Sequence, residues 1–135
     1  FSAQGPGNAV LIKSAYPWVD EVSGPASLAQ MLLNNPDASG RPRPAQKLCA
    51  GQTLLCKALG LKVPMWDAKR FDQEQLYVED VGLAPTQIIQ TTRLGIPGGR
   101  DEHLMYRFVD GGYAPYCTRN PLRRGQVEGR DYVLI

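Results

Sequence analysis

The sequence predicts an α+β fold, in which two or three helices pack on a small mixed, mostly antiparallel sheet. Apolar residues recur at helical spacing in two segments, and short runs with β-branched residues recur elsewhere. Turns rich in Gly and Pro separate these segments. With 135 residues, of which 43% are hydrophobic and 21% charged, the chain is long enough for one folded domain.

The first predicted element is a buried strand over Asn8–Lys13. The run Ala9–Ala15 is short, apolar and partly β-branched, as buried strands are. A turn is expected before it at Gly5–Gly7. Pro17 ends the run, because proline cannot donate a hydrogen bond to a strand ladder.

Two helices are expected next. The first runs from Ser23 through about Asn34, with Pro25 in its first turn. The second has Thr53 near its N-cap and Gly60 near its C′ position. The expected apolar residues are Leu28, Met31 and Leu32 in the first helix and Leu54, Leu55, Ala58 and Leu59 in the second.

The rest of the chain predicts strands joined by turns. No element is predicted over residues 62–82, which are mixed and polar. The expected strands are Thr86–Ile96, Leu104–Val109 and Asp131–Ile135, and the expected turns are Pro97–Gly99 and Asp110–Tyr113.

The residue types exclude several kinds of chemistry. No metal site is expected, because one histidine and three distant cysteines do not supply a ligand set. Neither a Walker A motif nor a dinucleotide fingerprint is present, and no apolar run of about 18 residues predicts a transmembrane helix. His103 is expected at the surface, and Cys49, Cys56 and Cys117 are expected to be buried thiols in a reducing compartment.

Basic residues give the remaining signal. The net charge is only +2, but arginine is concentrated late in the chain. In addition, the segment Lys47–Leu61 begins a helix, and the bare N–H groups of a first helical turn favour anions such as phosphate. From composition alone, a solvated surface and a nucleic-acid-binding face both remain open. The late arginines are Arg93, Arg100, Arg107, Arg119, Arg123, Arg124 and Arg130.

Four motifs follow one another along the chain. They are Gln4-Gly-Pro-Gly-Asn-Ala-Val-Leu-Ile-Lys13, Leu48-Cys-Ala-Gly-Gln-Thr-Leu-Leu-Cys-Lys-Ala-Leu-Gly-Leu61, Thr92-Arg-Leu-Gly-Ile96 and Tyr106-Arg-Phe-Val109. This series resembles the alkyladenine (3-methyladenine) DNA glycosylase family over nearly the whole chain. The resemblance implies a monofunctional, base-excision-repair enzyme. Such an enzyme flips an alkylated or deaminated purine out of double-stranded DNA and hydrolyses its glycosidic bond.

The resemblance also implies roles for particular residues. Lys13 stands where the family has a basic residue beside the attacking water, and Leu94 stands where a backbone carbonyl faces that water. Both are therefore expected to be catalytic. The residues expected to bind DNA are Gly51, Thr53, Arg93 and Gly95. The alternatives from the residues alone are a strand-end surface lysine for Lys13 and a simple helix cap for Thr53.

The sequence departs from the family pattern at two positions of the helix motif and in one larger respect. Gln52 replaces the motif's proline, and Leu54 replaces its phosphate-facing lysine. The family's catalytic glutamate precedes the strand with which this chain begins. We therefore expect residues 1–135 to be the C-terminal part of a single glycosylase domain and to be inactive alone, because the general base is missing.

Expectations about surroundings follow from the same resemblance. No metal or organic cofactor, no membrane and a monomeric state are expected, with damaged double-stranded DNA as the partner. The protein would lie in the cytoplasm at the nucleoid of a bacterium, or in the nucleus of a eukaryote. Two alternatives stay open: a non-catalytic nucleic-acid-binding module on the same scaffold, and an unrelated small α+β interaction domain.

Overall fold

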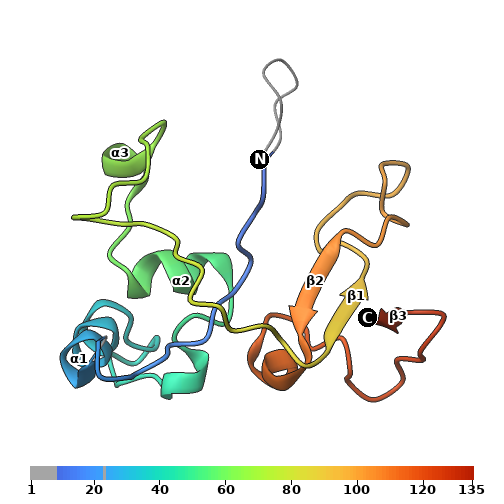
Figure 1. Cartoon of the computed structure of the whole chain (residues 1–135), viewed down its shortest axis with the longest axis horizontal. Coiled ribbons are helices and arrows are strands. Elements are labelled where there is room, and N and C mark those ends of the chain that lie inside the picture. Colours follow the sequence, from blue (N-terminus) through green and yellow to red (C-terminus); the bar gives the residue numbers. More distant parts are fainter. Residues whose placement is uncertain (1–8, 23) are drawn as a thin grey trace. The chain divides into compact units, whose positions relative to one another are not determined.

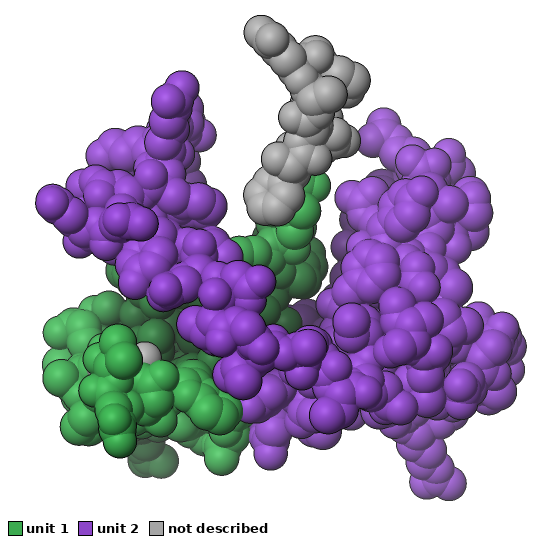
Figure 2. Space-filling model, viewed as in Figure 1, with its two compact units in different colours: residues 1–60 green, residues 61–135 purple. Residues whose placement is uncertain are grey.

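The computed structural model describes residues 9–22 and 24–135 (Figure 1). The chain divides into two compact units, residues 1–60 and residues 61–135, which Figure 2 colours separately. The turn expected at Gly5–Gly7, the predicted strand residue Asn8 and the predicted helix residue Ser23 lie outside the described residues. In the described ranges, no helix is both long and apolar enough to span a membrane.

Unit 1 is built on two helices, α1 (Gly24–Asn34) and α2 (Gln52–Ala58), with the short 3₁₀ helix η1 (Ala45–Lys47) between them. Both helix predictions are confirmed. The core is formed by Leu48, Cys49 and Ala58, which are almost completely buried. Burial of one leucine side chain contributes about 1.5–3 kcal/mol. The partly buried residues that pack against this core are Leu28, Met31, Leu32, Ala45 and Leu55.

The ends of α2 differ in part from the prediction. Its N-cap is Gly51, in extended conformation, and Thr53 lies exposed within the first turn. The observed N-cap therefore lies two residues before Thr53, the position near which the sequence predicts it. At the other end Gly60 has φ +68°, the left-handed conformation expected after a helix C-terminus. Leu59 is exposed rather than part of the buried face, because the packed stripe ends at Ala58.

Two adjacent asparagines at the end of α1 hold α2 in place. Asn34 Nδ2 donates to the carbonyl oxygen of Ala58 at 3.0 Å, at the C-terminal end of α2. Asn35 Nδ2 donates to the carbonyl oxygens of Leu48 at 2.8 Å and Leu54 at 3.1 Å, on either side of the first turn. Asn35 is fully buried, so these bonds form away from water, where leaving a donor unpaired is costly.

The predicted buried strand at the start of the chain is wrong for its described residues. Residues 9–20 form no strand, and Val10, Leu11 and Ile12 are 77%, 68% and 50% exposed. The composition of an apolar run fixes its preference for extended backbone, but a strand also needs a neighbour that supplies its ladder of hydrogen bonds. The segment is tied to the core further on, where Ala15 N–H donates to the Cys49 carbonyl at 3.0 Å.

Unit 2 contains a three-stranded antiparallel sheet in the order β2-β1-β3. The strands are β1 (Ile88–Thr91), β2 (Arg107–Asp110) and β3 (Tyr132–Leu134). All three predicted strands of this part of the chain are therefore confirmed, each shorter than expected. Together with the helices of unit 1, the sheet confirms the α+β prediction.

The register assigns the strand residues to two faces of the sheet. Ile89 pairs with Val109 on β2 and with Leu134 on β3, and Ile89 is fully buried. Gln90 pairs with Phe108 on β2 and with Val133 on β3, so these three residues share the opposite face. The first face therefore belongs to the core of unit 2, whereas the second face carries the exposed Phe108.

Two further elements lie in regions where the prediction was incomplete. The segment after β2 forms a 3₁₀ helix, η2 (Gly111–Tyr116), where only a turn was expected. Asp110 caps it by accepting a hydrogen bond from Gly112 N–H at 2.9 Å. Residues 62–82, for which nothing was predicted, include the four-residue helix α3 (Val63–Trp66).

The three cysteines differ in environment. None forms a disulfide. Cys49 is buried in the core of unit 1, and burial raises the pKa of its thiol. Cys117 is partly buried, whereas Cys56 is exposed on α2, which corrects the expectation that all three are buried. Cys56 follows Leu55, which packs against the core, and its side chain lies on the exposed side of α2. The apolar character of cysteine does not by itself say which side of a helix it occupies.

Candidate functional site

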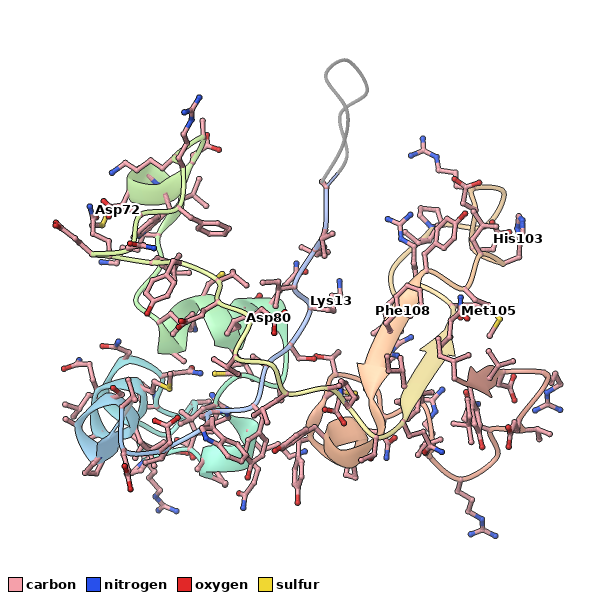
Figure 3. The ribbon with its side chains drawn as sticks, viewed as in Figure 1. Lys13, Asp72, Asp80, His103, Met105 and Phe108 are labelled. Atoms are coloured by element: carbon pink, nitrogen blue, oxygen red, sulfur yellow. The ribbon has the colours of Figure 1, made fainter. Side chains whose placement is uncertain are left out.

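Lys13 is brought to the beginning of α2. Its Nζ atom donates to Oε1 of Gln52 at 3.2 Å, across 39 positions of sequence. Figure 3 shows Lys13 on the extended N-terminal segment. The side chain of Lys13 is partly buried and that of Gln52 is exposed. The arrangement keeps an ammonium group near the surface of unit 1 beside a neutral acceptor, and an ammonium group has three donors in all.

Gly51 and Thr53 lie on either side of Gln52. Gly51 is the N-cap of α2 and provides no side-chain oxygen to the first turn. Thr53 is exposed within that turn. The structure therefore places three of the predicted features, Lys13, Gly51 and Thr53, in one unit and around one helix start.

Arg93, Leu94 and Gly95 lie in the segment that follows β1. The strand ends at Thr91, and Gly95 follows with φ +74°, a left-handed conformation that favours glycine. A Cβ atom at Gly95 would meet nothing within 4 Å, so its backbone conformation, and not crowding within this chain, calls for glycine. Arg93 is exposed, whereas Leu94 is partly buried. These three predicted residues belong to unit 2.

Arg107 is not part of an exposed basic face, which corrects the prediction for one of the late arginines. Its Nη2 atom donates to the carbonyl oxygen of Thr118 at 2.6 Å and to that of Arg119 at 3.1 Å. A third contact joins the same atom to Sγ of Cys117 at 3.3 Å. Burial lowers the pKa of Arg107 below its ordinary value. The side chain therefore ties β2 to the segment after η2.

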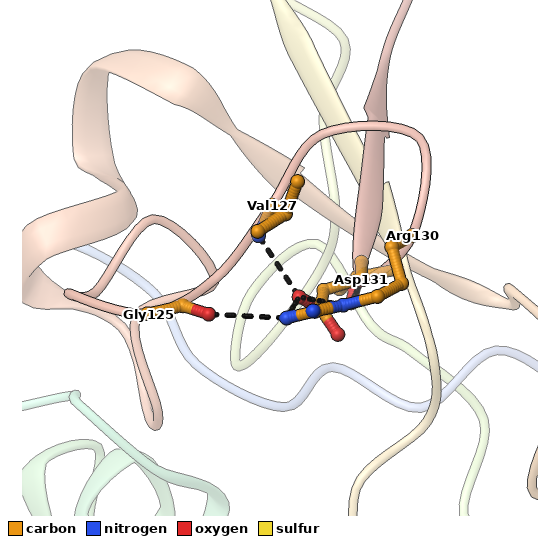
Figure 4. Close-up of polar contacts among 5 residues, drawn as sticks. Gly125, Val127, Arg130 and Asp131 are labelled. Carbon is orange, nitrogen blue, oxygen red and sulfur yellow. Dashed lines mark hydrogen bonds and ion pairs between the residues drawn. The ribbon is translucent and has the colours of Figure 1, made fainter.

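Arg130 also binds within its own unit (Figure 4). It forms an ion pair of 2.7 Å with Asp131 and donates to the Gly125 carbonyl at 3.2 Å. Asp131 in addition accepts from Val127 N–H at 2.8 Å. The Arg130 hydrogen bond first, and then the Val127 bond, lower the pKa of Asp131, and the Asp131 bond raises the pKa of Arg130. Exposed pairs of this kind add little stability.

His103 is exposed, as predicted, in the turn between β1 and β2. Figure 3 labels it on the loop that joins β1 to β2. In residues 9–22 and 24–135, no three His, Cys, Asp or Glu side chains gather in a way that could hold a metal ion.

Sequence reasoning missed two residues that organise the helix start. Gln52 was noted only as a departure from the motif, and the structure makes it the partner of Lys13. Asn35 was noted only as part of a helix stop, and the structure makes it the buried support of the loop and first turn around α2. An Asn-Asn-Pro sequence signals a helix end, but nothing local tells which distant carbonyls the amides reach.

Comparison with known proteins adds to this geometry. A sequence profile of the family described as "Methylpurine-DNA glycosylase (MPG)" matches residues 1–114. A Pseudomonas fluorescens (strain Pf0-1) protein named "Putative 3-methyladenine DNA glycosylase" is 87% identical over all 135 residues, which cover 58% of its length. Proteins with the same name are 78% identical in Pseudomonas syringae pv. syringae (strain B728a) and 67% identical in Pseudomonas aeruginosa (strain UCBPP-PA14), with 60% and 56% of their lengths covered. No solved structure gives a significant match.

The fold and the candidate site define a small α+β protein with basic side chains at a helix start and at a strand end. The profile match over residues 1–114 then shows that the chain belongs to the methylpurine-DNA glycosylase family. This confirms the resemblance that the four motifs indicate. The chain spans less than two thirds of the length of these curated relatives.

Proposed function

We propose that this chain is part of a DNA glycosylase that removes methylated purines, 3-methyladenine among them, from double-stranded DNA. The match of residues 1–114 to the family carries the proposal, and the names of the Pseudomonas relatives support it. The proposed substrate is a purine flipped out of the duplex, which costs least for a damaged and poorly paired base. Deaminated purines such as hypoxanthine are a further proposed substrate class, and the bacterial nucleoid is the proposed place of action.

Lys13 is proposed to position the attacking water. Hydrolysis of a glycosidic bond develops positive charge on the sugar, so a cation lowers the barrier not through the sugar but through the water, which the ammonium group can hold by donating a hydrogen bond. Gln52 restrains the Lys13 ammonium at 3.2 Å without neutralising it. A lysine side chain lacks the rigid planar guanidinium of arginine, so its ammonium group can take many positions. The hydrogen bond to Gln52 limits these positions.

The turn after β1 is proposed to contribute a backbone acceptor and a phosphate contact. The carbonyl of Leu94 would orient the attacking water, a role that depends on backbone geometry and not on the leucine side chain. Arg93 is exposed and can reach a phosphate through its guanidinium. Further contacts to DNA through the protein backbone are proposed at Gly51, Thr53 and Gly95.

The general base is proposed to come from outside the four motifs. The family resemblance assigns it to a glutamate, and none of the matched motif residues is a glutamate. We therefore propose that the 135 residues do not hydrolyse the bond by themselves and that they form a single, monomeric domain together with further polypeptide.

Two polypeptides test the proposal. One is the 135-residue chain alone. The other, called here the joined polypeptide, carries these 135 residues in place of the matching 58% of the Pseudomonas fluorescens relative. Release of 3-methyladenine from alkylated duplex DNA is expected from the joined polypeptide only. DNA binding without release by the joined polypeptide would favour the non-catalytic binding module, and absence of both would favour the unrelated interaction domain.

A further inference from the structure

The second face of the sheet in unit 2 is apolar and open. Phe108 is 58% exposed, although it lies in the middle of β2, and Ile135 is 62% exposed. Ile88 and Ile135 exchange two backbone hydrogen bonds, of 2.8 and 2.9 Å, and therefore lie side by side. We call the residues of this face the open sheet face, and they are Ile88, Gln90, Phe108, Asp110, Val133 and Ile135. Phe108 and Ile135 are exposed, and the other four are half-buried.

Two polar side chains lie on this face, and both are engaged within unit 2. Asp110 accepts a hydrogen bond from Gly112 N–H at 2.9 Å. Gln90 Nε2 donates to the carbonyl oxygen of Met105 at 2.8 Å, so its donor is already used within unit 2. Phe108 pairs with Gln90, and Val133 pairs with it from the other side. The result is a continuous row from strand to strand in which hydrocarbon dominates. Figure 3 labels Phe108 on β2.

The edge of the same sheet is also open. In the order β2-β1-β3, strand β2 pairs with β1 on one side, and in the described part of the chain no strand pairs with its other side. Tyr106, directly before β2, is 64% exposed. Exposed apolar faces and unpaired edges of this kind mark surfaces that another polypeptide covers.

The lengths of the relatives indicate which polypeptide covers this face. The matched 135 residues make up 58% and 60% of two relatives, so about two fifths of each lies outside the match. We propose that the open sheet face is the docking surface for that remaining part of the family polypeptide, with Phe108 as its central anchor. The proposal rests on the part of the proposed function that joins these 135 residues to further polypeptide, and it does not depend on the proposed catalytic activity.

Exposed positions allow a test that leaves the core of unit 2 intact. Phe108→Lys puts a charge into the centre of the proposed interface, and Val63→Lys makes the same change at another exposed apolar residue of unit 2, on α3. The first measurement is capture of the 135-residue chain by the remaining part of the Pseudomonas fluorescens relative, produced as a separate tagged polypeptide. The second measurement is the Tm of the joined polypeptide.

Capture of the unsubstituted chain is expected, with a loss of about tenfold or more in affinity for Phe108→Lys and no change for Val63→Lys. In the joined polypeptide Phe108→Lys is expected to lower Tm by on the order of 10 °C, because a charge is then buried. An unchanged Tm for Phe108→Lys would overturn the proposal even if the separate polypeptides fail to associate. A stable dimer of the 135-residue chain that Phe108→Lys dissociates would also overturn it, since a second copy would then cover the face.

Discussion

Lys13 Nζ and Gln52 Oε1 lie 3.2 Å apart, and this contact joins the extended N-terminal segment to the first turn of α2. Lys13 is the residue that the family resemblance places beside the attacking water, and Gln52 is a position where the sequence departs from the family's helix motif. A matched residue and a departure are thus in direct contact. The structure connects them through a single hydrogen bond from a cation to a neutral amide.

The first prediction concerns this contact. Gln52→Ala in the joined polypeptide should lower kcat for 3-methyladenine release by about 2- to 10-fold, because one hydrogen bond to a charged group is lost at an exposed site. KM should change less than kcat if Gln52 acts by positioning Lys13. Gln46→Ala, at an exposed glutamine of η1, is the matched control and should leave both constants unchanged. An unaltered kcat for Gln52→Ala would remove the positioning role.

The second prediction compares two exposed arginines. Arg93→Ala should weaken binding of the joined polypeptide to damaged or abasic duplex DNA more than Arg124→Ala does. The reason is that Arg93 follows β1 directly, in the turn that we assign to DNA, and loss of one phosphate contact reduces the salt slope of binding by about one. Titrations at several salt concentrations measure both effects. Equal losses for the two variants would mean that the DNA face is misplaced.

The third prediction concerns the stability of unit 1. Asn35→Ala removes a buried hydrogen bond to the Leu48 carbonyl and a partly buried one to the Leu54 carbonyl. The free energy of unfolding should fall by about 2–3 kcal/mol, measured as a lower urea midpoint with the same slope. Asn35→Asp should cost more, because a carboxylate would face those two carbonyls. Gln46→Ala serves again as the control, and a midpoint for Asn35→Ala equal to the control's would contradict the assigned role.

The fourth prediction concerns pH. The pKa of Asp131 is lowered in the folded chain, so its unfolded form binds a proton more readily. The stability it contributes is therefore fully present above the ordinary carboxyl pKa of about 4 and is lost as pH falls through the lower folded-state pKa. Asp131→Asn should flatten the pH dependence of Tm in this acid range. Glu79→Gln, at an exposed carboxylate, should not, and identical profiles for both variants would refute the assignment.

The sequence was most informative where structure is local. The helix over residues 24–34 is predictable because proline, an apolar stripe and an Asn-Asn-Pro stop agree, and Gly60 adopts the left-handed conformation that its position after a helix predicts. The strands of unit 2 are predictable for the same reason, although Gly95 and its turn shorten the first of them.

Contacts between distant segments were not predictable. The run from Ala9 has the composition of a buried strand, yet its exposure depends on whether another strand lies beside it. An arginine in a polar segment is expected at the surface, yet Nη2 of Arg107 contacts three groups in the segment after η2. Lys13 was placed at the candidate site by resemblance, but its partner Gln52 could be found only from the folded chain.

The most direct measurement is the release of 3-methyladenine from alkylated duplex DNA by the joined polypeptide, with Lys13→Ala and Lys57→Ala as a matched pair. Lys57 is exposed on α2 in the same unit and has no assigned role. We predict release by the unsubstituted protein, a fall of about 10²-fold for Lys13→Ala, as for loss of one group that positions the attacking water, and full activity for Lys57→Ala. Absence of release from the joined polypeptide, or equal activity of the two variants, would contradict the account.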